Sequence, residues 1–287
     1  MDEKVLEQVI NVACLPGIQK ASMAMSDAHW GYGFCIGGVA AFSPEDGVLS
    51  VGGVGFDGGC GVRTLKTDLK LKDIKPKIKQ VVDKIFEEVP AGLGNRGEIL
   101  VQGDEINNLL TKGAKWAVEK GYGNENDLEY IEDNGCVTGA DPKKVSDIAI
   151  KREKKQIGTL GSGNHYLEIQ YVSEIYDENA AKVFGLEKDQ ILISIHCGSR
   201  ALGHQIGTDY LKVLAEASRK YNIPIKDREL VCAPINSKEG KDYFAAMCCA
   251  LNYSYANRQM IAHLIRTILK KIAQSGKMLK VLLPSEM

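Results

Sequence analysis

Residues 52–63 (GGVGFDGGCGVR) constrain the fold of this chain more than any other stretch, because half of these twelve residues are glycine. Glycine reaches positive φ and allows close approach of the backbone, but it weakens ordinary strands and helices. We therefore expect a tight loop that turns Asp57 and Cys60 toward the same point. A carboxylate and a thiolate together suit a transition metal, since sulfur binds soft or borderline ions and oxygen binds harder ones. A buried turn with a core cysteine is the alternative that this stretch alone leaves open.

A second glycine-rich turn presents further metal-ligand types. Residues 160–168 (LGSGNHYLE) place His165 at the start of an alternating strand, and His196 stands at the end of the apolar strand predicted at 191–195. Residues at strand ends are often functional, because a rigid element holds them in place. A thiolate can bridge two ions, so Cys60 could share one ion with Asp57 and His165 and a second ion with His196. Two ions roughly 3.5–4 Å apart can stabilise both the attacking and the leaving oxygen in phosphoryl transfer.

The other three histidines give weaker evidence of a metal-binding role. His263 lies in a helical apolar pattern and is interpreted as structural. His204 could be a ligand or an exposed loop residue, with a structural or phosphate-contacting role favoured, and the role of His29 stays open. Familiar nucleotide motifs fail: residues 53–58 match GxGxxG formally, but no helix follows, and Walker A and HExxH motifs are absent.

Hydrophobic periodicity predicts an α+β fold, a single mixed α/β domain over residues 1–287 with no internal boundary and with the metal site on glycine-rich loops at strand ends. A chain of 287 residues with 44% hydrophobic content can bury a proper core. The periodicity predicts a polar and aromatic loop at 25–33. It predicts strands at 47–54, 62–69 and 191–195, and helices at 5–12, 74–89, 105–120, 142–154, 178–186, 209–221 and 241–272.

The remaining composition narrows the function classes. No apolar run approaches the roughly 18 residues of a membrane helix, and the first residues lack the features of a signal peptide. The eight cysteines include no CxxC pair, which fits reduced thiols and predicts a cytoplasmic protein. With a net charge of −1, binding of nucleic acid would require a local basic patch.

The chain resembles the RtcB-type RNA-splicing ligases. The resemblance runs from about residue 5 to about residue 272, and its motifs occur in the family's order. They are residues 25–34 (MSDAHWGYGF), 52–63, 160–168, 196–205 (HCGSRALGHQ) and 256–259 (ANRQ).

The resemblance implies a GTP- and Mn²⁺-dependent RNA ligase of tRNA splicing or RNA repair, which joins an RNA 3′-phosphate or 2′,3′-cyclic phosphate to a 5′-hydroxyl. In that family a histidine attacks GTP, and GMP passes to the RNA end before the 5′-hydroxyl displaces it. The resemblance makes Cys60 the thiolate between two Mn²⁺ ions, with Asp57 and His165 on one and His196 on the other. RNA and the activator archease are the implied partners. The residues implied to line the guanine nucleotide site are Asn164, His165, Tyr166, Leu167 and Glu168.

The chain departs from the family most clearly at its C-terminal end. Family members continue beyond this length, and their further part carries another metal-binding histidine, the guanylated histidine, and nucleotide-binding serine and lysine residues. Residues 270–287 do not follow the family pattern, so the catalytic domain is expected to be incomplete, unless a second polypeptide supplies the rest. Smaller departures are Ser26 for a usual proline, the pair Gly58-Gly59, and Ala201 for a usual glycine.

Two other hypotheses stay open from the sequence. The chain could be a dinuclear metal phosphoesterase that uses the same ligands without guanylation. It could also be a catalytically silent fragment that binds metal or RNA.

Overall fold

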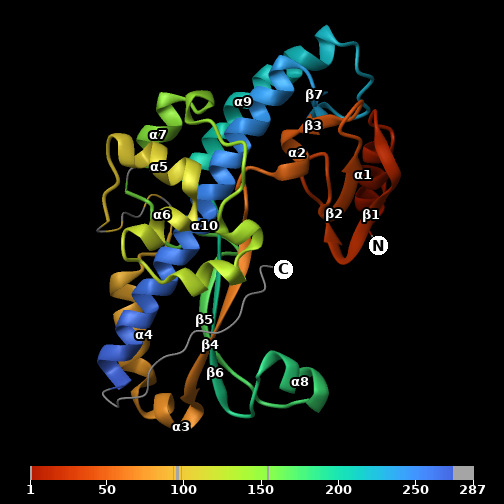
Figure 1. The fold of residues 1–287 in the computed structure, drawn as a ribbon. Coiled ribbons are helices and arrows are strands. Elements are labelled where there is room, and N and C mark those ends of the chain that lie inside the picture. Colours follow the sequence, from red (N-terminus) through yellow and green to blue (C-terminus); the bar gives the residue numbers. More distant parts are fainter. Residues whose placement is uncertain (1, 93, 95–96, 98, 154, 274–287) are drawn as a thin grey trace. The chain divides into compact units, whose positions relative to one another are not determined.

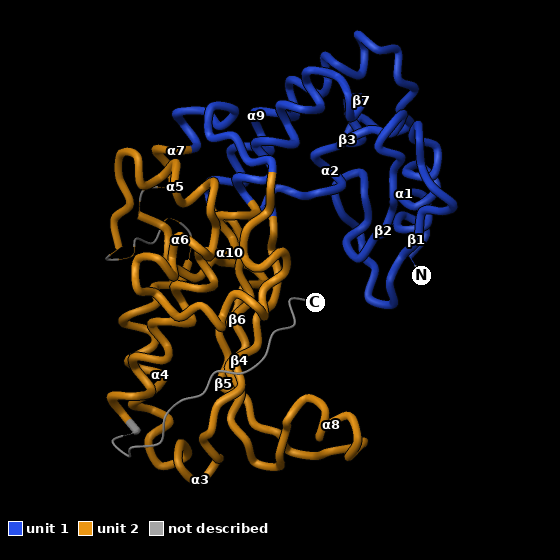
Figure 2. Tube along the Cα trace, viewed as in Figure 1, with its two compact units in different colours: residues 1–58, 139–149, 201–250 blue, residues 59–138, 150–200, 251–287 orange. Residues whose placement is uncertain are grey.

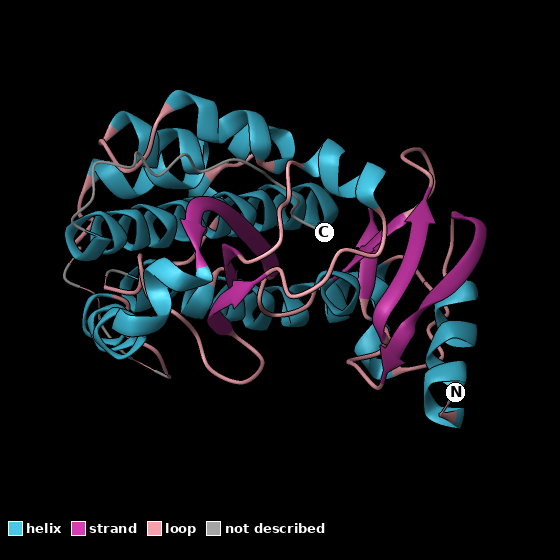
Figure 3. Cartoon of the chain, turned by 90° about the horizontal axis from the view of Figure 1, so that it is seen from below, coloured by secondary structure: helices cyan, strands magenta, loops and turns pink. Residues whose placement is uncertain are grey.

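The computed structural model describes residues 2–92, 94, 97, 99–153 and 155–273. Over these residues the fold is mixed α/β, as predicted, with ten α-helices and three short antiparallel sheets (Figures 1 and 3). The chain divides into two compact units whose segments alternate along the sequence (Figure 2). The first unit comprises residues 1–58, 139–149 and 201–250, and the second comprises 59–138, 150–200 and 251–287. A single domain without an internal boundary stays a prediction.

The first unit is built on a β-hairpin, a small second sheet and helices. Helix α1 (Glu3–Ala13) begins at Asp2, whose carboxylate accepts a hydrogen bond from the Lys4 amide. Strands β1 (Ile18–His29) and β2 (Ile36–Phe42) pair with each other, and β3 (Val48–Ser50) pairs with β7 (Cys232–Pro234). The unit also contains all or most of the short helices α2 (Val51–Val54), η4 (Pro142–Lys144) and η5 (Arg228–Leu230), and of the longer helix α9 (Arg200–Lys220).

The second unit is organised around a three-stranded sheet with the order β4-β6-β5. Strand β4 covers Gly61–Lys70, β5 covers Tyr166–Tyr171 and β6 covers Gln190–Cys197. The surrounding helices are α3 (Leu71–Ile74), η1 (Lys75–Lys77), α4 (Ile78–Glu88), α5 (Asp104–Lys112), α6 (Ala114–Glu119), η2 (Glu125–Tyr130), η3 (Glu132–Gly135) and α8 (Glu178–Phe184). Helix α7 (Asp147–Glu153) and the 36-residue helix α10 (Lys238–Ala273) belong partly to each unit.

Strand β6 carries the core of the second unit on one face. Its residues Ile191, Ile193 and Ile195 are buried in one cluster with Ile261 and Ile265 of α10. Burying an aliphatic side chain of this size contributes about 1.5–3 kcal/mol. Because side chains alternate across a strand, Leu192, Ser194 and His196 face away from this core.

The sheet register brings three strand ends together. His196 pairs with Val62 of β4 on one side and with Tyr166 of β5 on the other. Since β6 runs antiparallel to both neighbours, its end lies beside the beginnings of β4 and β5 (Figure 1). Residues just before β4 and β5 are thereby held next to the end of β6.

Several predicted elements differ from the structure. The predicted loop at 25–33 is partly strand, because β1 extends to His29 and pairs with β2. The predicted strand at 47–54 is strand only over Val48–Ser50, and a helical turn follows. The predicted helix at 105–120 breaks at Gly113, which has φ +58°.

Helix α9 begins nine residues earlier than predicted, at Arg200 rather than at residue 209. Its first turns contain Gly203 and Gly207, and glycine in a sequence ordinarily indicates that a helix is interrupted or ends. A Cβ at Gly207 would lie 2.9 Å from the Phe56 ring. Glycine is therefore retained inside this helix because an aromatic ring packs directly against its backbone.

None of the helices in the described part of the chain is long and apolar enough to cross a membrane.

Candidate metal centre

Cys60 occupies the position just before β4, at the end of the glycine-rich loop. The preceding Gly59 has φ +69°, and a Cβ there would lie 2.9 Å from the Ser254 hydroxyl oxygen. Both its backbone conformation and its packing therefore require glycine. The loop leaves the Cys60 side chain exposed, so the alternative of a buried turn with a core cysteine is wrong.

His165 and His196 reach the Cys60 sulfur from the two other strands. His165 lies just before β5, and His196 is the last residue but one of β6. The Nε2 atom of each imidazole lies 3.2 Å from Cys60 Sγ, and the two ring centroids are 5.4 Å apart. Both imidazoles therefore direct Nε2 at the same sulfur, an arrangement that is compatible with a thiolate shared by two metal ions.

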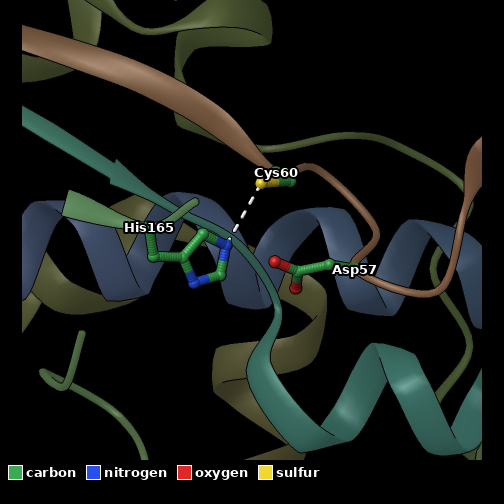
Figure 4. A group of neighbouring side chains, drawn as sticks. All are labelled: Asp57, Cys60 and His165. Carbon is green, nitrogen blue, oxygen red and sulfur yellow. Dashed lines mark hydrogen bonds between the residues drawn. The ribbon is translucent and has the colours of Figure 1, made fainter. Parts of the chain in front are cut away.

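Asp57 joins this group from the same loop as Cys60. Its carboxylate, Cys60 Sγ and a His165 ring nitrogen all lie within 4.8 Å of one another (Figure 4). Only Gly58 and Gly59 separate Asp57 from Cys60, so the covalent chain itself limits how far the carboxylate lies from the sulfur. Sulfur, imidazole nitrogen and carboxylate oxygen together form a donor set suited to Zn²⁺, Co²⁺ or Mn²⁺.

The glycine-rich turn before β5 leaves room for the imidazole of His165. A Cβ on Gly161 would lie only 1.7 Å from His165 Nδ1 and 2.8 Å from Arg200 Nη1. Real Cβ atoms do not approach other atoms this closely, so the imidazole packs directly over the Gly161 backbone. Close packing against His165 is therefore the steric reason for one glycine of this turn.

The residues predicted to line a nucleotide site divide between the two faces of β5. Tyr166 lies beside His196, with ring centroids 5.1 Å apart, whereas Leu167 packs against the buried core. Glu168 is exposed and accepts a hydrogen bond from Gln170, and Asn164 is exposed in the preceding turn. A side-chain role at such a site is therefore open to Asn164, Tyr166 and Glu168, whereas Leu167 could contribute only its main chain.

The other histidines have different surroundings. His29 is exposed at the end of β1, with Nδ1 2.9 Å from the Asp27 carbonyl oxygen. His204 lies in α9 rather than in the loop that was one of its predicted settings, exposed and with its ring 5.3 Å from that of Phe56. His263 is half-buried in α10 and packs edge-on against Tyr122. Burial and the nearby charges of Arg266 and Lys270 lower the pKa of His263, which agrees with its interpretation as a structural residue.

No role was predicted for the polar residues of α10, although Arg258 donates hydrogen bonds to the carbonyl oxygens of Gly59 and Cys197, the neighbours of Cys60 and His196. Asn257, Arg258 and Gln259 are almost fully buried. Their signal in the sequence is three consecutive polar side chains inside a long and otherwise largely apolar helix.

These observations define a class of protein. It is a mixed α/β protein in which a glycine-rich loop and neighbouring strand ends bring cysteine, histidine and aspartate side chains together as a candidate metal site. Centres of this kind suit reactions at phosphate, in which positive charge must be held beside the reacting oxygens.

Sequence comparison identifies the family. Residues 8–284 match the family described as tRNA-splicing ligase RtcB. The chain is 56% identical over 276 residues to the tRNA-splicing ligase RtcB of Methanococcus maripaludis, an alignment that covers 96% of this chain and 58% of that protein. It is 52% identical over 272 residues to the tRNA-splicing ligase RtcB of Archaeoglobus fulgidus, covering 95% and 56%. It is 48% identical over 264 residues to the RNA-splicing ligase RtcB of Mycobacterium tuberculosis, covering 91% and 61%. The chain belongs to the RtcB family.

The chain spans somewhat more than half the length of these curated relatives. The family match continues to residue 284, so the expectation that residues 270–287 depart from the family pattern is wrong for residues 270–284. Residues 274–287 lie outside the described part of the structure.

Proposed function

We propose that this chain carries the dinuclear metal centre of a GTP-dependent RNA ligase. The reaction would join an RNA 3′-phosphate or 2′,3′-cyclic phosphate to a 5′-hydroxyl through a guanylated histidine, in tRNA splicing or RNA repair. The observation that carries the proposal is the placement of Cys60 Sγ at 3.2 Å from Nε2 of both His165 and His196. The names of the curated relatives support RNA as the substrate class.

We assign these donors to two ions that would share one thiolate. In the proposal Cys60 bridges the ions, Asp57 and His165 complete the protein ligands of one, and His196 serves the other. When bound, the ions would neutralise charge on the phosphate and orient the attacking and leaving oxygens. The exposed position of the Cys60 sulfur leaves it open to ions and substrate from solvent.

The residues beside the donors would orient the nucleotide. Tyr166 stacks its ring edge-on against His196, which restricts the orientation of that imidazole. Glu168 lies two residues further along the same face of β5, where its carboxylate could accept hydrogen bonds from a guanine base. Asn164 lies in the turn beside His165 and offers both a donor and an acceptor for a phosphate or ribose.

The identity of the metal is the part of the proposal that depends most on the family. A set of sulfur and imidazole donors binds Zn²⁺ and Co²⁺ more tightly than Mn²⁺. A Mn²⁺ enzyme with these ligands would depend on metal availability for its selectivity. Metal binding is therefore best measured on protein stripped of metal and reloaded with one ion at a time.

We propose the cytoplasm as the place of action, where thiols stay reduced; none of the eight cysteines forms a disulfide. We further propose that ligation requires polypeptide corresponding to the part of the relatives that this chain does not match, and that archease assists the complete enzyme.

The deciding experiment compares metal binding by the wild-type chain and by Cys60→Ala. With metal-free protein and added Mn²⁺, we expect two bound ions in the wild type and none in the variant, since alanine offers no donor to replace the thiolate. Elemental analysis after gel filtration gives the stoichiometry. Two ions still bound to Cys60→Ala would contradict the bridging role.

A second arm of this experiment separates the ligase from a hydrolase. A phosphoesterase would hydrolyse an RNA 3′-phosphate or a model phosphate ester with Mn²⁺ and without GTP. We expect no such hydrolysis above the rate of the Cys60→Ala variant. GTP-independent turnover that is lost in this variant would replace the ligase proposal with a metal phosphoesterase.

A further inference from the structure

The middle of helix α10 contains a buried guanidinium that carries no assigned role. The Arg258 side chain is only 1% exposed. Taking a charged group out of water is costly unless hydrogen bonds compensate for the lost hydration. The partners of Arg258 therefore indicate what this buried charge stabilises.

Arg258 joins the two strand ends that carry metal donors. Its Nη1 atom donates one hydrogen bond to the carbonyl oxygen of Gly59 and another to that of Cys197, both at 2.6 Å. Gly59 immediately precedes Cys60, and Cys197 immediately follows His196. A single nitrogen thus holds the main chain beside the thiol and the main chain beside one imidazole at a fixed separation.

The neighbouring Asn257 holds the segment that leads to the third donor. Its side-chain oxygen accepts a hydrogen bond from the Gly158 amide at 2.7 Å, and its side-chain nitrogen donates to the Thr159 carbonyl oxygen at 3.2 Å. This segment continues through Gly161 to His165. Asn257 and Arg258, two consecutive residues of one helix, therefore contact the backbone of the three segments that carry Cys60, His165 and His196.

We infer that Arg258 is a positioning residue for the metal centre, which sets the distance between Cys60 Sγ and His196 Nε2 through the Gly59 and Cys197 carbonyl groups. This inference rests on the proposed function, because it presumes that these donors bind metal. Arg258 itself offers no metal ligand, since a guanidinium remains protonated and has no free electron pair to donate. Its effect would be comparable to that of the outer partners that orient ligands in other metal sites.

A purely structural role is the alternative to be tested. Arg258 also lies over the Tyr255 ring, 5.6 Å from its centroid, and its loss would leave two carbonyl groups without this donor. Reduced stability alone would therefore not distinguish the two roles. The test needs a readout that reports on the metal–sulfur bond.

The experiment titrates metal-free wild-type chain, Arg258→Met and Arg258→Lys with Co²⁺ and follows the thiolate-to-cobalt charge-transfer absorption. This band arises only when Cys60 binds the ion, which a Cys60→Ala titration verifies. We expect Arg258→Met to bind Co²⁺ about 10–100-fold more weakly, the range found when outer partners of metal ligands are removed. Arg258→Lys keeps a donor but loses the planar fork, so its affinity should fall between the two.

Asn252→Ala provides a matched control on the same helix. The Asn252 side chain is also fully buried and bridges backbone groups, but its partners are Leu110 and Val137, which lie in segments without donors. We expect this variant to lose thermal stability and to bind Co²⁺ as the wild type does. Circular dichroism at the titration temperature verifies that every variant is folded.

Each outcome has a distinct meaning. A folded Arg258→Met chain with wild-type affinity and an unchanged charge-transfer band would overturn the positioning role. So would an Asn252→Ala chain that loses as much affinity as the Arg258 variants, because general destabilisation would then explain the loss. A wild-type chain with no thiolate band would instead refute the metal centre itself, and with it the function on which this inference rests.

Discussion

Gly161 leaves no room for a side chain beside His165. A Cβ at this position would lie 1.7 Å from His165 Nδ1, so alanine must displace the imidazole or the turn that carries it. We predict that Gly161→Ala weakens Co²⁺ or Mn²⁺ binding about 10-fold or more, a size typical of disturbed ligand orientation. Isothermal titration of the metal-free protein measures the change.

Gly163→Ala is the control for this prediction. Gly163 lies in the same turn with φ +72°, and a Cβ there would meet nothing within 4 Å. Alanine at Gly163 therefore adds backbone strain without pressing on His165. Equal losses of metal affinity in the two variants would show that strain in the turn, rather than the contact with His165, is responsible.

His263 provides a test of a residue interpreted as structural. Its pKa is lowered by burial and by nearby positive charges, so the unfolded chain binds a proton more readily than the folded chain. Protonation therefore favours unfolding, and stability from this group is present above the unfolded pKa of about 6.5 and decreases as the pH falls below it.

We predict that His263→Gln leaves metal binding unchanged and reduces the loss of stability between about pH 7.5 and pH 5.5, the range around the ordinary histidine pKa. Urea unfolding of both proteins at the two pH values measures this difference. Loss of metal binding by a folded His263→Gln chain would contradict the structural role.

Within the second unit, helix α10 forms a buried ion pair in addition to the hydrogen bonds of Arg258. Arg266 donates two hydrogen bonds of 2.6 Å to the Asp127 carboxylate, and the two residues are 7% and 4% exposed. Burial acts to raise the pKa of Asp127, but the hydrogen bonds and charge of Arg266 outweigh it and hold that pKa below its usual value. Stability from this carboxylate is therefore present above the unfolded pKa of about 3.9 and is lost as the pH falls below it.

We predict that Arg266→Met lowers the free energy of unfolding by about 3–5 kcal/mol at neutral pH, because it leaves the Asp127 charge buried without its partner. The double variant Asp127→Asn, Arg266→Met should recover part of this loss. Urea denaturation of the two variants and the wild type gives the comparison. A single variant no less stable than the double variant would mean that the unpaired charge is not the cause.

The segments of the two compact units alternate along the chain, and helix α10 belongs partly to each. The chain nevertheless corresponds to only 56–61% of each of the three relatives described above. In the function proposed above, the guanylated histidine would lie in the part of those relatives that this chain does not match. Activity of the chain with GTP is therefore a separate question from metal binding.

We predict that the chain, loaded with Mn²⁺ and incubated with GTP labelled at the α-phosphate, acquires no covalent label on a denaturing gel. The tRNA-splicing ligase RtcB of Methanococcus maripaludis, treated in the same way, tests whether a relative that contains the unmatched part acquires the label. A labelled band from this chain would place the nucleophile among its own histidines, with His29, His204 and His263 as the residues to substitute next.

The sequence alone predicted most of the regular elements, and it selected Asp57, Cys60, His165 and His196 as candidate donors. Long apolar periodicity indicated α10, and an uninterrupted apolar run indicated β6, because burial of one face or of a whole strand leaves a direct trace in the residue pattern. The start of helix α9 was predicted wrongly, because a glycine inside this helix allows close packing instead of ending the helix. Gly207 lies inside α9 against Phe56, although glycine ordinarily indicates a helix end.

What the sequence by itself determined is the family, which the comparisons confirm, and a set of candidate donors: a thiol, two imidazoles and a carboxylate beside glycine-rich turns or a strand end. Only the tertiary structure decided that both imidazoles meet at the Cys60 sulfur, because the antiparallel register of β6 with β4 and β5 brings donors 105 and 136 residues from Cys60 to one point. It also decided that the buried polar residues of α10 hold the main chain beside those donors. Side-chain type is local information, whereas contacts across such separations depend on strand register and helix packing.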